Sequence, residues 1–150
     1  MSTIGVIVGL DIGDARTGVA RSDALQMIAF PYKVVHAATE TDMLRNVAAL
    51  IKELEPILVV AGLPLSQDGV DGPRAEKTKD ILAKLREMIN VDIITEDERF
   101  TTAQALRVAR DMKASRRSQK GKVDQIAASL ILQSFLDRRR AQGAAQPAQE

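Results

Sequence analysis

The spacing of apolar residues changes once along the chain, and that change divides the sequence into two parts. In the first part, short apolar runs bounded by turn residues predict strands at residues 4–10, 17–21 and 27–35. The links between these strands are short, which favours an antiparallel meander. At residues 43–54 the apolar positions recur at helical spacing instead, and Pro56 ends the predicted helix.

In the second part, strands and helices alternate. Continuous apolar runs at residues 57–61 and 91–95 predict short buried strands. A helix that begins near Pro73 lies between them. A capping box predicts another helix over residues 101–112, and apolar spacing predicts a last helix over residues 123–139.

This order of elements predicts an α/β fold with a five-stranded mixed sheet flanked by helices, three strands being antiparallel and two parallel. Right-handed crossovers should place the two later strands beside the first one. The chain has 150 residues, the size of one domain. We expect that domain to span residues 1–138 and residues 139–150 to form a flexible tail.

Composition excludes several classes of protein. No apolar run approaches the length of a membrane span, and the N-terminus lacks the features of a signal peptide. The absence of cysteine excludes disulfides, a thiolate nucleophile and a cysteine zinc site. We therefore expect a cytoplasmic protein.

The charge is distributed unevenly. Residues 1–112 carry a net charge of −4, whereas residues 113–140 carry +6. Five of the basic residues lie in KASRRSQKGK (113–122), a segment with no aromatic residue. We interpret this segment as a mobile loop that holds a phosphate backbone. A solvated basic loop without a ligand is the alternative.

Asp11 is the first candidate for chemistry, because an apolar strand leads directly into its carboxylate in VGLDIGDARTGVARSD (8–23). A single acid after a strand is often a turn residue. Here, however, the turn residues are Gly13 and Asp14. The predicted topology also places Asp11 at the middle of a sheet edge, where α/β folds usually bind their ligands.

Further acids could meet Asp11. The run Glu96, Asp97 and Glu98 ends a strand near the first one, and strand alternation lets only one of Asp97 and Glu98 face Asp11. Asp124 falls in the first turn of the last predicted helix, where the helix dipole alone would favour an acid. We predict that Asp124 lies at the margin of that helix's packed stripe. The residues of the predicted stripe are Val123, Ile126, Ala127, Leu130, Ile131 and Ser134.

Three converging carboxylates without histidine or cysteine form a site of hard oxygen ligands, the type that binds Mg²⁺ or Mn²⁺. A pair of such ions can activate a water molecule and stabilise the leaving oxygen in phosphoryl transfer. The only histidine, His36, follows the third predicted strand, and we interpret it as an exposed strand-end residue.

Four segments, in order and in register, resemble the RuvX/YqgF family of pre-16S rRNA nucleases and Holliday junction resolvase-like proteins. They are GLDIGDARTGVARSD (9–23), VVAGLPLSQDG (59–69), EDERFTT (96–102) and KGKVDQIAASLILQSFLD (120–137), within a match over residues 4–138. The resemblance implies an RNase H-like fold and a metal-dependent nuclease that matures the 5′ end of ribosomal RNA. Some members look like junction resolvases instead.

The resemblance also assigns residues. The catalytic and metal-binding acids would be Asp11, Glu98 and Asp124. Together with the basic segment, the resemblance indicates nucleic-acid contacts from Arg16, Arg99, Arg116, Arg117, Lys120 and Lys122. The strand that ends at Gly62 carries no acid where RuvC-type resolvases place one, so the site depends on Glu98 reaching over.

Three other functions fit parts of the sequence. A Holliday junction resolvase in DNA recombination and repair would use the same acids, and an RNA-binding ribosome-assembly factor would need only the basic segment. A strand followed by Asp-x-Gly and a hairpin also opens the phosphate-binding motif of actin-like ATPases and sugar kinases, which need two such domains. The expected partners are pre-rRNA or branched DNA and ribosomal precursor particles, not a membrane. The sequence leaves open whether the protein is a monomer or a homodimer.

Overall fold

The computed structural model describes residues 4–65, 68–98 and 117–145, with the side chains of the last helix described over residues 123–143. The elements are β1 (Ile7–Ile12), β2 (Arg16–Ser22), β3 (Ala29–His36), α1 (Glu40–Leu54), β4 (Leu58–Leu63), α2 (Pro73–Arg86), β5 (Ile93–Asp97) and α4 (Arg117–Ala145). The helix expected over residues 101–112 lies outside the described residues.

The strands form one sheet in the order β3-β2-β1-β4-β5. The β1–β2 and β2–β3 pairs are antiparallel, whereas β4 runs parallel to β1 and β5 runs parallel to β4. The predicted meander and the predicted placement of the two later strands beside β1 are therefore confirmed. The central position of β1 explains its continuous apolar run, because both of its faces are covered.

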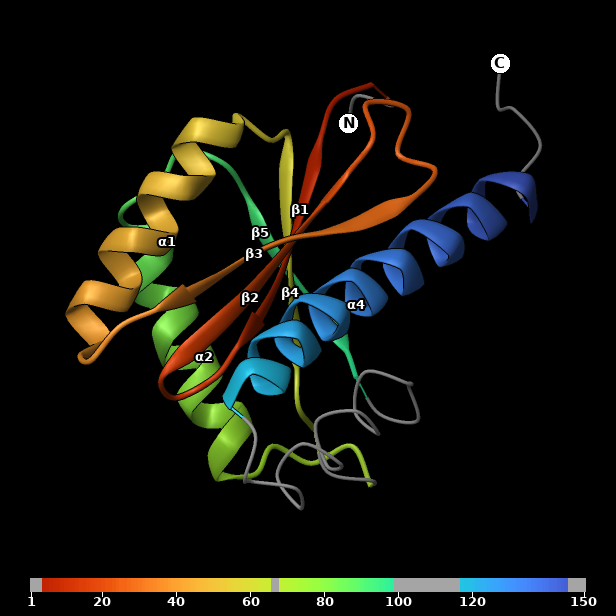
Figure 1. Ribbon diagram of the computed structural model, residues 1–150. Helices are drawn as coiled ribbons and strands as arrows, with labels where there is room; N and C mark the ends of the chain where they lie inside the picture. The colour runs from red at the N-terminus through yellow and green to blue at the C-terminus, as the bar shows by residue number, and fades with distance from the viewer. Residues whose placement is uncertain (1–3, 66–67, 99–116, 146–150) are drawn as a thin grey trace.

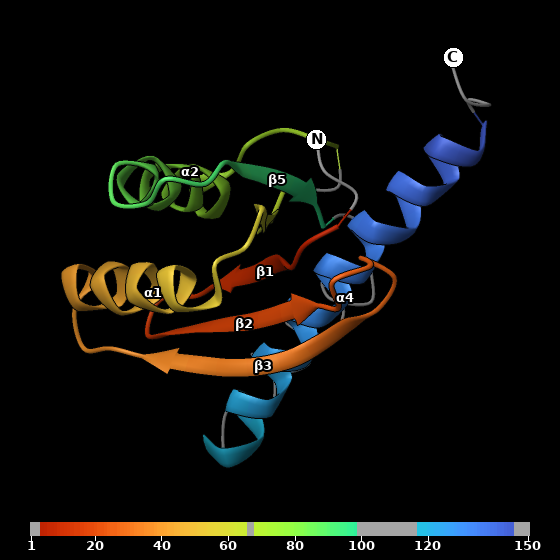
Figure 2. The same cartoon turned by 90° about the horizontal axis from the view of Figure 1, so that it is seen from above.

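Helices cover the two faces of the sheet unequally, as Figures 1 and 2 show. Val8 and Leu10 of β1 pack into the apolar cluster that α1 and α2 form on one face. Ile7, on the opposite face, packs into a second cluster with α4. Among the described helices, only α4 crosses this second face, where it contacts β1, β2, β3 and β4. Strand alternation therefore tells which side chains lie beneath α4.

The buried stripe of α4 matches the prediction only in part: Ala127 and Ile131 lie on it as expected, and its other members differ. It consists of Asp124, Ala127, Ala128, Ile131, Leu132, Phe135 and Leu136. Ile126, which was expected to be packed, is 42% exposed. Asp124 lies on the buried stripe rather than at its margin. The helical-wheel argument failed because it ranked positions by hydrophobicity, and this stripe begins with a carboxylate.

Some boundaries also differ. Strand β1 extends to Ile12, so Asp11 lies inside the strand rather than after it. Helix α4 begins at Arg117, so the mobile loop expected over residues 113–122 is helical from that residue on. Lys, Arg and Gln are good helix formers, which is why a polar segment can extend a helix. The same helix continues to Ala145, past its expected end at residue 139. In spite of this length, the described part of the chain holds no helix apolar enough to cross a membrane.

Candidate active site

Asp11 is a buried carboxylate on the central strand, with 3% of its surface exposed. It lies on the same face of β1 as Ile7 and Gly9, the face beneath α4. The helix α4 approaches β1 closely at this glycine: a Cβ added at Gly9 would lie 2.8 Å from Cβ of Leu132. The side chain of Asp11 therefore points to the layer between the sheet and α4.

On one side of Asp11, the neighbouring strand brings Asp124 close. Gly18 of β2 is the register partner of Asp11. A Cβ at Gly18 would lie 2.0 Å from the backbone oxygen of Asp124 and 3.2 Å from its Cβ. Because adjacent strands lie about 4.8 Å apart, the missing side chain of Gly18 is the space that Asp124 fills next to Asp11. Asp124 itself is 1% exposed.

On the other side of Asp11, a second glycine on a neighbouring strand lets Glu98 come close. Leu10 of β1 and Ala61 of β4 are register partners, and Asp11 and Gly62 follow them. A Cβ at Gly62 would lie 2.7 Å from Oε2 of Glu98, which is 1% exposed. The backbone N–H of Glu98 donates to the carbonyl of Leu63 at 3.2 Å. Glu98 thus reaches over β4 toward Asp11, as the absence of an acid on β4 requires.

The structure therefore brings the three predicted acids to one face of the sheet, around the two glycines that flank Asp11. It also decides between the two acids that the sequence left open. Asp97 is only partly buried and alternates to the other face of β5, whereas Glu98 lies on the face of Asp11.

Arg16, which the sequence suggested as a phosphate contact, forms an ion pair with Asp124 in the structure. Its Nε donates to Oδ2 of Asp124 at 2.7 Å, and the two side chains are 23% and 2% exposed. Asp124 lies well inside α4, which begins at Arg117, so the helix dipole expected to stabilise it acts too far away. The guanidinium of Arg16 therefore offsets the charge of this buried carboxylate.

Sequence reasoning named Glu96 only as part of the acidic run and did not recognise it as a further buried acid. It is 3% exposed, accepts from the hydroxyl of Ser134 at 3.2 Å and is paired with the guanidinium of Arg138. Its position two residues before Glu98, and hence on the same face of the strand, is the signal that could have revealed it. Glu96 joins β5 to the C-terminal half of α4.

The remaining predicted contacts have different outcomes. Arg99 and Arg116 lie outside the described residues. Arg117, Lys120 and Lys122 belong to the first turns of α4, but their side chains are outside the described part of the structure. His36 is exposed at the end of β3, as expected.

The donor atoms at this site suit a hard divalent cation, since carboxylate oxygens are the ligands that Mg²⁺ and Mn²⁺ prefer. The space that a Cβ at Gly18 or Gly62 would take is filled by Asp124 and by Ile131 and Glu98, so the two glycines let these acids approach the sheet. Among the described residues, however, no three His, Asp or Glu side chains are gathered into a group that could hold a metal ion as they stand. Asp124 is directed to Arg16 instead.

A mixed sheet in this order, with buried acids on β1, after β5 and on α4, defines a protein with the RNase H-like fold of junction resolvases. The structure is similar to that of Thermus thermophilus RuvC in complex with a Holliday junction substrate, with a TM-score of 0.56 at 14% identity over 90% of this chain and 95% of that chain. It is also similar to the fowlpox virus Holliday junction resolvase, with a TM-score of 0.52 at 17% identity over 89% of this chain and 99% of that chain.

Closer relatives are found by sequence. A sequence profile of the RuvX family, described as Holliday junction resolvase, matches residues 5–138. A protein of Roseiflexus sp. (strain RS-1) named "Putative pre-16S rRNA nuclease" is 37% identical over 91% of this chain and 96% of its own length. One of the same name from Halothermothrix orenii is 40% identical over 87% of this chain and 94% of its own length. The chain therefore belongs to the RuvX family, a family of nucleases that hydrolyse phosphodiester bonds, as its motifs indicated.

The close approach of α4 to Gly18 predicts a large effect of a single methyl group. Gly18→Ala places a Cβ against a backbone oxygen that can move only if α4 moves, so we expect a loss of about 3 kcal/mol in the free energy of unfolding. Urea unfolding measures it. Gly143→Ala, which adds its methyl group in open space on α4, should be neutral or stabilise by up to about 1 kcal/mol. Equal stability of the two variants would contradict the packing described.

The buried ion pair makes a second prediction. Arg16→Ala leaves the buried carboxylate of Asp124 without the guanidinium, and should lower the free energy of unfolding by about 2–3 kcal/mol. The added change Asp124→Asn should recover much of the loss, which a double-mutant cycle measures. The control is Arg45→Ala, which removes an exposed pair with Asp42 and should cost less than about 1 kcal/mol. Equal losses in Arg16→Ala and Arg45→Ala would show that Arg16 does not stabilise Asp124.

Proposed function

We propose that the protein is a divalent-metal-dependent nuclease that processes the 5′ end of pre-16S rRNA during ribosome biogenesis. The placement of Asp11, Glu98 and Asp124 around Gly18 and Gly62 is the observation that carries this proposal. Buried acids that gather on one face of a sheet repel one another, and a bound cation relieves that repulsion. The pre-16S rRNA nuclease name of the relatives supports the choice of substrate, and the cytoplasm is where we expect the reaction.

The metal would be Mg²⁺ or Mn²⁺, as a pair of ions held by Asp11, Glu98 and Asp124. Such ions supply an activated water molecule and stabilise the leaving oxygen of a phosphodiester. Arg16 is already at the site through its bond to Asp124, so its guanidinium would provide positive charge where a phosphate approaches. The chain's own contribution is to hold the acids in place beneath α4.

A second candidate, cleavage of branched DNA, is favoured by the description of the family profile as a Holliday junction resolvase. The same acids would serve either substrate. The two functions differ in what is cut: a precursor rRNA with an unpaired 5′ segment, or a four-way DNA junction. Side-by-side digestion of both substrates with one enzyme preparation decides between them.

The proposed site predicts the outcome of a cleavage assay on a precursor 16S rRNA fragment. Cleavage should require Mg²⁺ or Mn²⁺ and should fall at least about 100-fold in Asp11→Asn, because the amide keeps the size of the side chain but loses the charge that binds a cation. Thermal unfolding should show that the variant still folds. Asp80→Asn, which changes an exposed carboxylate on α2, is the matched control and should retain full activity.

Activity in the presence of a chelator, or in Asp11→Asn, would contradict the metal mechanism. RNA binding without cleavage by the unmodified protein, at any metal concentration, would favour the RNA-binding ribosome-assembly factor instead.

The basic segment at residues 113–122 carries a separate prediction. If Arg116 and Arg117 contact phosphates, the double variant Arg116→Ala/Arg117→Ala should bind RNA more weakly, to a similar degree for all sequences. The slope of log affinity against log salt should fall by about 0.7–0.9 for each lost contact. Titrations at two salt concentrations measure this slope. An unchanged slope would identify the segment as solvated and not as a nucleic-acid contact.

A further inference from the structure

Exposed apolar side chains gather at the end of the sheet where β2 turns into β3. Most of the large apolar residues exposed in the described part of the chain lie in or beside this hairpin. They are Ile4 (65% exposed), Leu25 (66%), Met27 (44%), Ile28 (53%), Phe30 (48%) and Tyr32 (38%). Since β3 is the edge strand of the sheet, no further strand covers them within residues 4–65, 68–98 and 117–145. Single exposed apolar residues are ordinary, but several in one hairpin point to a binding surface.

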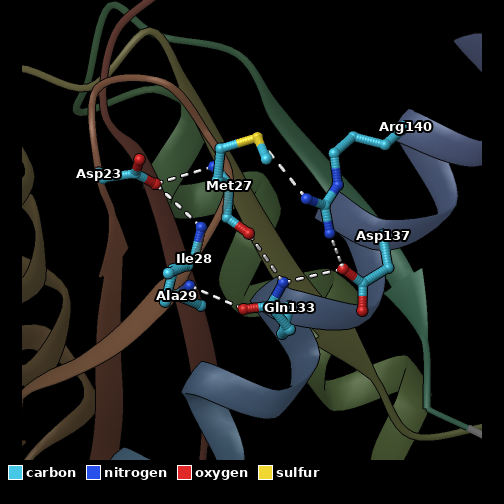
Figure 3. Close-up of polar contacts among 7 residues, drawn as sticks. All are labelled: Asp23, Met27, Ile28, Ala29, Gln133, Asp137 and Arg140. Carbon is cyan, nitrogen blue, oxygen red and sulfur yellow. Dashed lines mark hydrogen bonds and ion pairs between the residues drawn. The ribbon is translucent and has the colours of Figure 1, made fainter.

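This hairpin is held in a defined shape (Figure 3). Oδ1 of Asp23 accepts from the backbone N–H groups of Met27 and Ile28 at 2.8 and 2.9 Å. The N–H of Ile28 keeps the pKa of the Asp23 carboxyl below its usual value. Gln133 of α4 accepts from the N–H of Ala29 at 2.8 Å and donates to the carbonyl of Met27 at 3.1 Å. These hydrogen bonds fix the backbone of the hairpin in the conformation that exposes its apolar side chains.

Two aromatic rings and a guanidinium form the centre of this surface. Phe30 is the register partner of Arg21, and Cζ of Arg21 lies 5.9 Å from the centroid of the Tyr32 ring. Lys33 follows in the same strand. The chain has only four aromatic residues, three Phe and one Tyr, and two of them lie here with half-exposed rings.

The cluster of Arg21, Phe30 and Tyr32 lies on open sheet. Arg21 alternates with Ala20, which packs in the cluster beneath α4, so Arg21 and its partner Phe30 face the opposite side. That side is covered by α1 and α2, but Figure 2 shows that the hairpin half of β3 extends beyond the end of α1. Rings at this place remain accessible to a ligand.

We propose that Phe30, Tyr32 and Arg21 form a stacking platform for the unpaired segment of the RNA substrate, an inference that rests on the proposed function. The register of β3 shifts between Pro31 and Lys33, and both Phe30 and the Tyr32 ring lie next to Arg21. The two rings can stack successive bases, while Arg21 and Lys33 offer positive charge to the phosphates between them. Charge decides against a second copy of this chain as the occupant. Arg139 adjoins the hairpin at Gln26, and Arg140, which is paired with Asp137, adjoins it at Met27. Together with Arg21 and Lys33 these residues make the surface basic, which favours a polyanion over a second copy with the same charge.

The platform is close to the candidate active site. Arg21 lies three residues from Gly18 along β2, which is about 10 Å. The two positions face opposite sides of the sheet, and β3 is the edge around which a single strand can pass from one side to the other. A nuclease that holds an unpaired strand there would prefer substrates with a single-stranded segment next to the cleaved bond.

The sequence provides a specific reporter for this platform. Tyr32 is the only tyrosine and the chain has no tryptophan, so tyrosine emission reports on Tyr32 alone. We expect single-stranded oligouridylate, added in a chelator so that no cleavage occurs, to quench this emission until the site is saturated. A parallel titration of free tyrosine amide with the same oligouridylate corrects for the light that the RNA absorbs. Inorganic polyphosphate, which has the charge but no bases, and duplex RNA should bind the basic surfaces without quenching.

Variants give the second measurement. Phe30→Ala should weaken oligouridylate binding by about tenfold, because one stacked base is lost, with an unchanged salt slope. Phe30→Leu keeps an apolar side chain but no ring, and should lose several-fold. Met88→Ala, which shortens an exposed apolar residue elsewhere, should bind as the unmodified protein does. Melting curves confirm that each variant folds.

Unchanged affinity in Phe30→Ala, quenching by polyphosphate, or binding of oligouridylate without quenching would overturn the platform. Concentration-dependent dimers that Phe30→Ala abolishes would overturn it in favour of self-association. If the unmodified protein shows metal-dependent cleavage but oligouridylate does not quench its tyrosine emission, only this inference is refuted. If oligouridylate quenches the emission but the protein cleaves neither precursor rRNA nor a DNA junction, only the proposed function is refuted.

Discussion

The contact between α4 and the sheet is the constraint on which the site depends. Three glycines, Gly9, Gly18 and Gly62, lie beneath this helix on three neighbouring strands, and a Cβ at any of them would meet another residue at less than 3 Å. Removing these side chains lets α4 rest directly on the backbone, at the close-packed density of a protein interior. Without that approach, Asp124 could not stand beside Asp11.

The same closeness creates the electrostatic character of the site. Four acids, Asp11, Glu96, Glu98 and Asp124, are buried in the layer between the sheet and α4. Burial of a carboxylate is unfavourable unless charge or hydrogen bonds offset it. Two ion pairs do so at the two ends of the contact: Arg16 with Asp124, and Arg138 with Glu96. These pairs also hold both halves of α4 against the sheet, and a bound cation would offset more of the negative charge.

Much of this could be predicted from the sequence, because strand periodicity, turn residues and connection length determine the topology of such a sheet. The choice of Asp11 was also within reach, because the turn residues are Gly13 and Asp14 and the predicted topology places Asp11 at the middle of a sheet edge. The buried stripe of α4 could not be predicted from the sequence in this way. Its position depends on where glycines on three neighbouring strands allow the helix to lie, and the hydrophobicity of the helix residues alone does not report that. The burial of Glu96 was missed for a related reason: its partners, Ser134 and Arg138, are distant in sequence.

The central claim is that Asp11, Glu98 and Asp124 act together on one or two divalent cations. Anomalous diffraction from a crystal soaked in Mn²⁺ tests it most directly, because manganese scatters anomalously and protein oxygen atoms do not. The account predicts a strong anomalous peak bounded by these three side chains, and its loss in Asp11→Asn crystals. Manganese bound only elsewhere on the molecule, with Arg16 still paired to Asp124, would contradict it.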